Sequence, residues 1–156
     1  MGVTAPLQTA GYSGTPLPKK LGLKAGQVVA FVGLPESLAS LAACEPFAEV
    51  DRAAAADELG PSEPHDLIHA FYTRAHDLEM ALNCLRAAIK PAGMIWISWP
   101  KKAAKVQTDI TEDVVRKFAL ERGLVDVKVC AVDEIWSGLK LVIPVAQRLT
   151  QPKPIR

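Results

Sequence analysis

The chain has 156 residues, of which 49% are hydrophobic and 22% charged, and 18 basic against 17 acidic side chains leave a net charge of +1. This length fits one domain with its own core, and the composition is that of a globular protein. The balanced charge provides no field that attracts nucleic acid or an anionic membrane. No apolar run approaches the length of a membrane span, and the three cysteines form no CxxC pair. We therefore expect a cytoplasmic protein with reduced thiols.

The N-terminal half begins without regular structure and then alternates between strand and helix. Gly, Pro, Ser and Thr predict an extended arm over residues 1–20, followed by a single domain over residues 21–146. "GQVVAFVGL" is apolar on both faces, like a strand inside a parallel sheet. "PESLASLAAC" has the apolar spacing of a helix that starts at a proline. "PFAEVD" predicts a short strand ending at Asp51, and "RAAAADELG" predicts one or two helical turns.

The C-terminal half repeats this alternation. "DLIHAFY" (residues 66–72) predicts another buried strand, after which Thr73 is suited to cap a helix. The apolar stripe of that helix comprises Leu78, Ala81, Leu82, Leu85, Ala88 and Ile89. "KPAG" ends the helix, and "MIWISW" predicts the next strand. Asp109 with Glu112 resembles a capping box that opens a last helix, which Gly123 closes.

Two final apolar segments, "LVDVKVCAV" and "LKLVIPV", are joined by "DEIWSG", a link so short that it requires an antiparallel hairpin. The Pro-rich residues 147–156 predict a flexible tail. Alternating strands and helices form a sheet covered on both faces. The sequence therefore predicts a three-layer α/β, Rossmann-like sheet of about six strands, mostly parallel, with a C-terminal antiparallel hairpin.

Several of these segments resemble a known superfamily. "LKAGQVVAFVG", "DLIHAFY" and "LRAAIKPAGMIWIS" are similar to the first, fourth and fifth strand regions of class I S-adenosylmethionine-dependent methyltransferases, whose sheet also ends in a hairpin. There is no room for the usual third strand, so the resemblance implies a shortened sheet of six strands. "GYSGTPL", "WPKK" and "CAVDEIWSGLK" together resemble an uncharacterised family of small bacterial proteins of unknown function, which implies this fold without a chemistry.

The donor loop of the methyltransferases contains two or three glycines, because the backbone must pass close to the ligand. Here Gly33 stands alone and is followed by Leu34 and Pro35. The resemblance assigns to Asp51 the role of an acid that holds ribose hydroxyls. Nicotinamide binding is disfavoured because GxGxxG is absent. Our first expectation is that the chain binds no cofactor. The alternative is that it binds S-adenosylmethionine at Gly33 and Asp51, which would be favoured if Leu34 and Pro35 leave the loop open.

Ligands of open α/β sheets bind beyond the carboxyl ends of the parallel strands. The residues expected at that edge are Thr73, Arg74, Trp99, Pro100, Lys101, Lys102, Asp133, Glu134 and Trp136. If "WPKK" faces "DEIWSG", they form either a ligand cleft or a salt-bridged cap. Lys101 and Lys102, joined by Lys20 from the arm, would hold a phosphate or carboxylate, and a solvated loop is the alternative. Trp96 is expected in the core, whereas Trp99 and Trp136 either cover the sheet end or contact a ligand.

Other chemistry is weakly indicated. His65 and His69 bracket a predicted strand and His76 follows it, which is not a metal-ligand pattern, and Cys130 is expected to be an inert core thiol. The sequence favours a non-catalytic, small-anion-binding Rossmann-like module with a degenerate cofactor loop, which acts through its ligand or a protein partner. The alternative is an atypical small methyltransferase.

Overall fold

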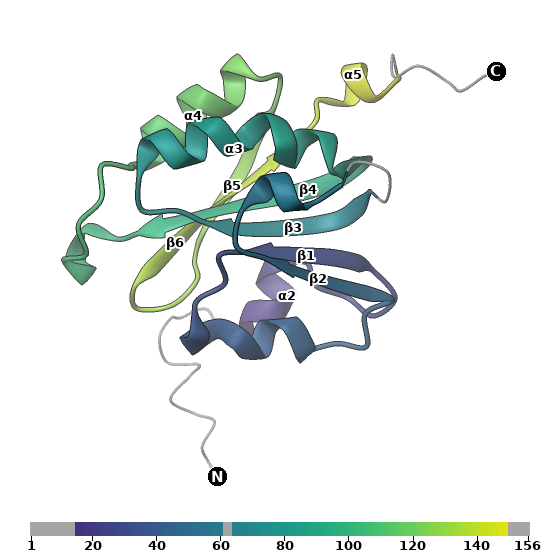
Figure 1. Ribbon diagram of the computed structural model, residues 1–156, viewed down its shortest axis with the longest axis horizontal. Coiled ribbons are helices and arrows are strands. Elements are labelled where there is room, and N and C mark those ends of the chain that lie inside the picture. Colours follow the sequence, from purple (N-terminus) through teal and green to yellow (C-terminus); the bar gives the residue numbers. More distant parts are fainter. Residues whose placement is uncertain (1–14, 61–63, 150–156) are drawn as a thin grey trace, which may run out of the picture.

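A computed structural model describes residues 15–60 and 64–149 and contains one six-stranded sheet (Figure 1). The strand order is β2-β1-β3-β4-β6-β5. The strands are β1 Val28–Val32, β2 Glu49–Ala53, β3 His65–Phe71, β4 Ile89–Pro100, β5 Val125–Ala131 and β6 Trp136–Val142. The first four are parallel, and β6 pairs antiparallel with both β4 and β5. The predicted fold class, including the missing third strand and the closing hairpin, is confirmed.

Helices cover both faces of this sheet (Figure 1). One face carries α3 and α4, and the other carries α2 and the 3₁₀ helix η1. The helical segments are α2 Leu17–Leu21, η1 Glu36–Ala43, η2 Ala56–Glu58, α3 Ala75–Ala87, η3 Lys102–Ala104, α4 Glu112–Glu121 and α5 Val145–Leu149. Within the described ranges, no helix combines the length and the apolar character that crossing a membrane requires.

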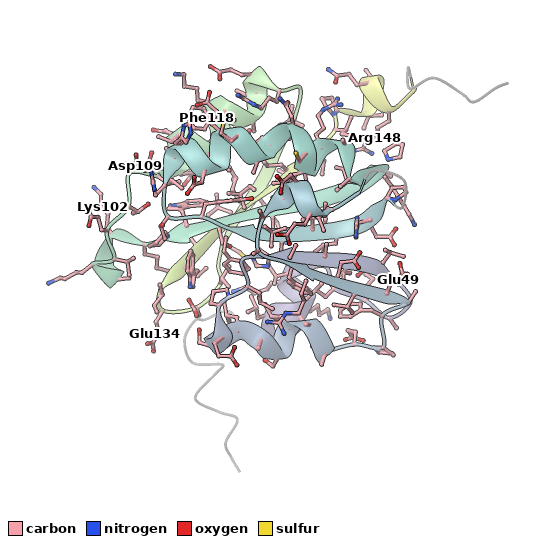
Figure 2. The ribbon with its side chains drawn as sticks, viewed as in Figure 1. Glu49, Lys102, Asp109, Phe118, Glu134 and Arg148 are labelled. Carbon is pink, nitrogen blue, oxygen red and sulfur yellow. The ribbon has the colours of Figure 1, made fainter. Side chains whose placement is uncertain are left out.

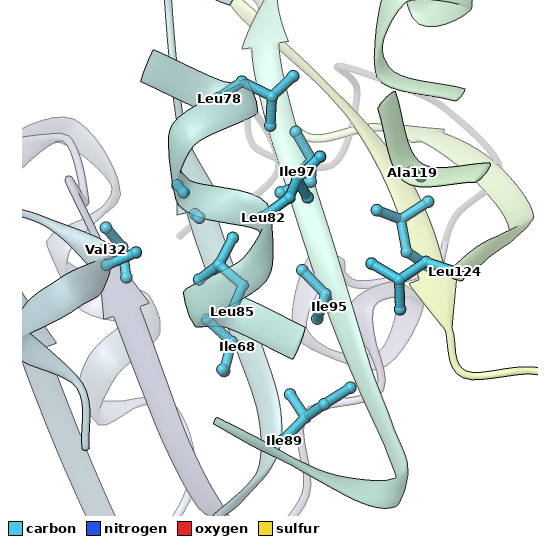
Figure 3. Close-up of a cluster of buried hydrophobic side chains, with 14 of the residues drawn as sticks. Val32, Ile68, Leu78, Leu82, Leu85, Ile89, Ile95, Ile97, Ala119 and Leu124 are labelled. Atoms are coloured by element: carbon cyan, nitrogen blue, oxygen red, sulfur yellow. The ribbon is translucent and has the colours of Figure 1, made fainter. Parts of the chain in front are cut away.

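The core under α3 and α4, which we call the upper core, is built mainly from aliphatic side chains (Figure 3). Leu78, Leu82 and Leu85 of α3 are fully buried against Ile95 and Ile97 of β4. These residues belong to the apolar stripe that helical periodicity predicts, but Ala88 and Ile89 of that stripe lie beyond the end of α3, and β4 already begins at Ile89. Because the parallel strands are buried on both faces, a second core is required on the opposite side of the sheet.

That lower core lies under α2 and η1 and contains most aromatic residues of the sheet, namely Phe31, Phe71, Trp96 and Trp136. Trp96 is fully buried there, and its indole Nε1 donates a hydrogen bond of 2.8 Å to the carbonyl oxygen of Leu21. Burial removes the apolar surface of the large ring from water, and the hydrogen bond gives the only donor of the indole an acceptor. The core role predicted for Trp96 is confirmed, and the contact fixes α2 against the sheet.

The predicted arm and tail both contain short helices. Residues 17–21 form α2, although the prolines of this segment suggest an irregular arm over residues 1–20. Pro18 lies in the first helical turn, where its missing N–H removes no hydrogen bond. At the other end, α5 occupies the first residues of the predicted tail. The remaining parts of both predictions, residues 1–14 and 150–156, lie outside the described residues.

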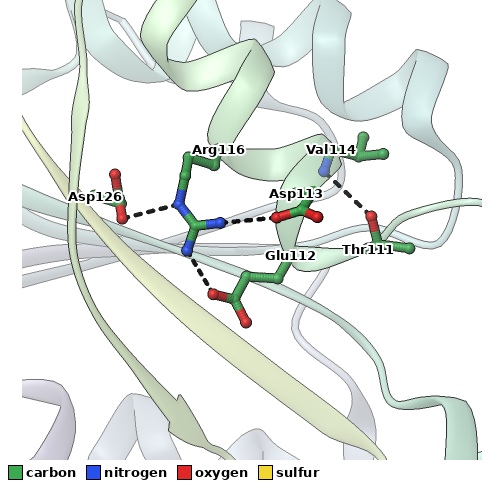
Figure 4. Close-up of polar contacts among 6 residues, drawn as sticks. All are labelled: Thr111, Glu112, Asp113, Val114, Arg116 and Asp126. Carbon is green, nitrogen blue, oxygen red and sulfur yellow. Dashed lines mark hydrogen bonds and ion pairs between the residues drawn. The ribbon is translucent and has the colours of Figure 1, made fainter.

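The N-terminal caps of the two long helices differ from the prediction. Thr73 does not cap α3; instead Asp109 Oδ1 accepts a hydrogen bond of 2.7 Å from the N–H of Ala75. Thr111, not Asp109, caps α4 by accepting from the N–H of Val114 (Figure 4). The loop before α4 contacts the start of α3. Asp109, which the sequence predicts as the cap of α4, therefore caps α3, a helix that begins 34 residues earlier.

Arg116 connects α4 to the edge strand β5 (Figure 4). Its guanidinium donates from Nε to Asp126 and from Nη1 to Asp113, both at 3.0 Å, and also pairs with Glu112. The hydrogen bond from Arg116 holds the pKa of the Asp126 carboxyl below its usual range. Charge-assisted contacts of this kind fix the orientation of the helix over the hairpin.

A histidine is completely buried in the lower core. Nε2 of His69 forms a hydrogen bond of 2.7 Å with the Ser98 hydroxyl, the ring stacks on Phe71, and Nδ1 has no partner. Burial lowers the pKa of His69 to about 3. The imidazole is therefore neutral in the folded protein at ordinary pH.

We predict that replacing Asp109 by alanine lowers the free energy of unfolding by about 1 kcal/mol, because α3 loses its N-terminal acceptor. Asparagine at this position retains an acceptor oxygen and should lose much less. Urea unfolding of the two variants measures the difference, and equal losses for alanine and asparagine would show that Asp109 does not act as a cap.

His69 should make stability depend on pH. Between its ordinary pKa of 6.5 and about 3, the unfolded chain binds a proton that folded His69 does not, so stability falls as pH falls through this window. From pH 7 to pH 5 this group should cost about 2 kcal/mol. Urea unfolding at both pH values should show this loss shrinking in His69→Gln and unchanged in His76→Gln, whose side chain is exposed. Identical pH dependence in both variants would contradict the assignment.

Candidate functional site

An open cleft of about 680 Å³ lies beyond the carboxyl ends of β1, β2 and β3. This is the point where the chain leaves β1 for β2 on one side and returns to β3 on the other, which is where sheets of this type bind ligands. We call it the Gly33 cleft. Its lining residues are Gly33, Ala54, Ala55, Ala56, Asp57, Phe71, Tyr72, Thr73, Asp77, Met80, Ala81, Cys84 and Trp136.

Gly33 forms the floor of the turn after β1. Its φ is +67°, and a Cβ at this position would lie 3.2 Å from the carbonyl oxygen of Phe71. The N–H of Gly33 donates to the carbonyl oxygen of Ala53 at 2.9 Å, which ties the ends of β1 and β2 together. Leu34 packs partly buried against the lower core, and neither Leu34 nor Pro35 lines the cleft. The loop after β1 therefore leaves space beside Gly33, which is the feature that the sequence alone did not decide.

The polar groups of the Gly33 cleft are acidic or neutral. Asp57 comes from η2 and Asp77 from the first turn of α3, and no lysine or arginine is among the described lining residues. The hydroxyl of Tyr72 is buried without a hydrogen-bond partner. Burial, and then the nearby Asp77 carboxylate, raise the pKa of Tyr72 well above its ordinary value. The cleft thus combines negative charge with a neutral hydroxyl whose hydrogen bonds are unsatisfied.

Aromatic side chains form one wall of the cleft. Trp136, at the start of β6, meets Phe71 edge to face with ring centroids 5.2 Å apart. Met80 of α3 is 67% exposed at the rim. Such apolar surfaces are suited to a planar ring, and the hairpin contributes to them although it is far from β1 in sequence.

Asp51 lies elsewhere. The strand β2 continues to Ala53, two residues beyond the predicted end at Asp51, and alanines follow where the resemblance places an acid. Asp51 Oδ2 contacts His65 Nε2 at 2.8 Å, and both residues line a separate cleft of about 350 Å³. The acid beside the Gly33 cleft on this side is Asp57 in η2, which sequence reasoning missed because its position depends on how the chain turns after β2.

The segments "WPKK" and "DEIWSG" do face each other. Pro100 is opposite Trp136 in the sheet, and the N–H of Lys101 donates to the carbonyl oxygen of Ile135 at 2.7 Å. Asp133 is occupied by the turn, since its Oδ1 accepts from the N–H groups of Ile135 and Trp136. The role of Asp133 here is that of a turn residue.

The remaining candidates do not form one constellation. Trp99 is only 6% exposed and belongs to the upper core. Lys102 and Glu134 lie exposed on different loops at the same end of the molecule (Figure 2), and in the described part of the chain neither they nor Lys101 form an ion pair. Arg74 is exposed at the start of α3, and Lys20 lies in α2 on the lower face.

The histidines are dispersed in the same way. His65 donates from Nδ1 to the carbonyl oxygen of Ala88 at 3.0 Å, and His69 is enclosed with Ser98. Across residues 15–60 and 64–149, no three acidic, histidine or cysteine side chains come together as a metal site would require. Cys130 is half-buried, and burial raises the pKa of its thiol, which lowers its reactivity as a nucleophile.

Comparison with solved structures shows that the fold of this chain is similar to that of methyltransferases. The chain is similar to magnesium protoporphyrin IX methyltransferase from Synechocystis with SAH bound, with 12% identity and a TM-score of 0.56 over 77% of this chain and 75% of that one. It is similar to a SAM-dependent methyltransferase from Aquifex aeolicus, with 18% identity and a TM-score of 0.55 over 81% and 87% of the two chains. A putative methyltransferase from Thermoplasma acidophilum has 9% identity and a TM-score of 0.55 over 87% and 76%.

No protein-family model and no curated protein matches the chain. At these identities the structural likeness establishes the class I methyltransferase-like fold and does not establish an activity.

The turn at Gly33 should tolerate substitution less well than an ordinary glycine turn. Gly33→Ala forces an alanine into a left-handed conformation, which costs about 1–2 kcal/mol, and also presses its Cβ on the Phe71 carbonyl. Gly26→Ala is the matched control, since Gly26 has a φ of +84° but nothing within 4 Å of the added atom. Urea unfolding should show the larger loss for Gly33→Ala; equal losses would mean that the close approach to Phe71 has no energetic effect.

Proposed function

We propose that this chain binds S-adenosylmethionine in the Gly33 cleft and acts as an atypical small methyltransferase. The observation that carries the proposal is the open cleft at the switch point between β1 and β3, with neither Leu34 nor Pro35 among the residues that line it. The alternative left open by the sequence is thereby favoured over a module with a closed donor loop. Membership of the uncharacterised bacterial family is a further part of this proposal and adds no chemistry.

The lining residues fit the chemistry of this ligand. S-adenosylmethionine carries a sulfonium and an ammonium, and Asp57 and Asp77 supply complementary negative charge. Trp136 and Phe71 offer aromatic surface for the adenine ring. Because Gly33 has no side chain, its backbone is open to close approach by a ligand.

This site departs from the family pattern in two respects. The turn after β1 has one glycine instead of two or three, and the end of β2 carries alanines instead of an acid. We propose that Asp57, four residues after Ala53, replaces the missing acid. This assignment makes Asp57 and Asp51 a test pair, because the first lines the Gly33 cleft and the second lines the separate cleft with His65.

When bound, S-adenosylmethionine supplies a methyl group on a sulfonium, which needs a correctly oriented acceptor rather than a covalent protein intermediate. The work of this chain is then to orient the ligand and exclude water. Thr73 and the exposed Met80 are among the residues that line the cleft, and none of the described lining residues is a histidine or lysine that would serve as a strong base. An acceptor that is already nucleophilic suits such a site.

Calorimetric titration with S-adenosylmethionine and S-adenosylhomocysteine tests the proposal. We expect a Kd in the micromolar range, weakened about tenfold by Asp57→Asn through loss of a charge-assisted contact and unchanged by Asp51→Asn. Absence of heat with both compounds up to about 1 mM would overturn the proposal, since weaker binding has no role at cellular concentrations. Binding that Asp51→Asn weakens and Asp57→Asn leaves unchanged would place the ligand in the other cleft.

A further inference from the structure

Two lysines stand directly opposite each other on the C-terminal hairpin. Lys128 of β5 and Lys140 of β6 are register partners in the antiparallel pair, so their side chains share one face of the sheet. Lys140 is also opposite Trp96 of β4, which belongs to the lower core. The pair therefore lies on the face opposite to α3 and α4. Lys128 is exposed, and Lys140 is half-buried.

This arrangement is electrostatically unfavourable in the free protein. Like charges directly opposite in an antiparallel pair destabilise it. Burial, and then the charge of Lys128, lower the pKa of the Lys140 ammonium. Within residues 15–60 and 64–149, neither ammonium forms a hydrogen bond or an ion pair, whereas Lys90 pairs with Asp66 at 3.0 Å.

A third lysine contributes to the same positive region. Burial raises the pKa of the Cys130 thiol in β5, and two positive charges nearby partly oppose this rise. These charges are those of Lys20, in the last turn of α2, and Lys128. Counter-charge from outside the chain would relieve the repulsion between Lys128 and Lys140.

We propose that Lys128 and Lys140, with Lys20 beside them, bind the phosphate group of a small phosphorylated ligand. Cross-strand partners hold their Cβ atoms about 5 Å apart, so two ammonium groups are presented to a single phosphate, whose oxygens accept several hydrogen bonds. A long nucleic acid is a poorer match, because the net charge is only +1 and a polymer needs a row of cations. This site is on the hairpin and does not depend on the Gly33 cleft being a donor site.

Thermal unfolding with added inorganic phosphate or pyrophosphate, against chloride at constant ionic strength, tests the site. We expect a saturable rise in Tm for the unaltered chain. Lys140→Met keeps the apolar stem and removes the charge, so it should raise the Tm without anion and weaken the anion response at least about tenfold. Lys128→Thr, with a residue suited to strands, should lose the response in the same way.

The matched control is the double variant Lys101→Met, Lys102→Met, which alters the lysines that the sequence favours for anion binding. It should keep the full response. Loss of the response in this control, its survival in Lys140→Met and Lys128→Thr, or its absence from the unaltered chain would each overturn the proposal. These outcomes are independent of S-adenosylmethionine binding, which calorimetry measures separately.

Adenosine monophosphate and a short single-stranded oligonucleotide distinguish the sources of the phosphate. We expect the monophosphate to compete with pyrophosphate at the hairpin. If the oligonucleotide instead binds more tightly than the monophosphate, with a salt dependence corresponding to more than about two phosphate contacts, the small-ligand proposal is overturned in favour of nucleic acid.

Discussion

The close approach of β1 and β3 at Gly33 constrains the rest of this structure. The chain must turn there with a positive φ, a Cβ would press on the carbonyl oxygen of Phe71, and the N–H of Gly33 is needed by Ala53 of β2. These contacts join the ends of three parallel strands at one residue. Because the turn is this tight, Leu34 is directed into the lower core, and a cleft is left open above the strand ends.

The shortened sheet explains which acid lines the Gly33 cleft. Without a third strand, β2 is an edge strand, and the short 3₁₀ turn η2 follows it directly. That turn carries Asp57 to the cleft, while Asp51 remains within β2 and pairs with His65. The acid is thus supplied after the strand and not by its last residue.

The hairpin serves two regions of opposite charge. Trp136, the first residue of β6, lines the acidic Gly33 cleft, and four residues later Lys140 is opposite Lys128 on the lower face. Antiparallel pairing with β4 brings the start of β6, and with it Trp136, to the carboxyl ends of the parallel strands. A parallel β6 would begin at the opposite end of the sheet. A single element therefore links the two sites that we propose.

The polar atoms of the two buried rings in the lower core differ in whether they have a hydrogen-bond partner. Trp96 and His69 are both fully buried, yet Trp96 finds the carbonyl oxygen of Leu21 whereas Nδ1 of His69 has no partner in the described structure. Desolvation keeps this imidazole neutral, so the core tolerates it near neutral pH at the expense of stability in acid.

The sequence by itself determined the order of the main elements: a strand within residues 26–34, most of the apolar stripe of α3, the buried Trp96 and the closing hairpin. Each depends on local periodicity or on link length, which one segment contains completely. Only the tertiary structure decided that Asp109 caps α3, that Asp57 and not Asp51 lines the cleft, and that Lys128 faces Lys140. Those relations are set by strand register and by the path of loops between distant segments. A shift of one residue in register turns a side chain to the other face, and no local pattern fixes that choice.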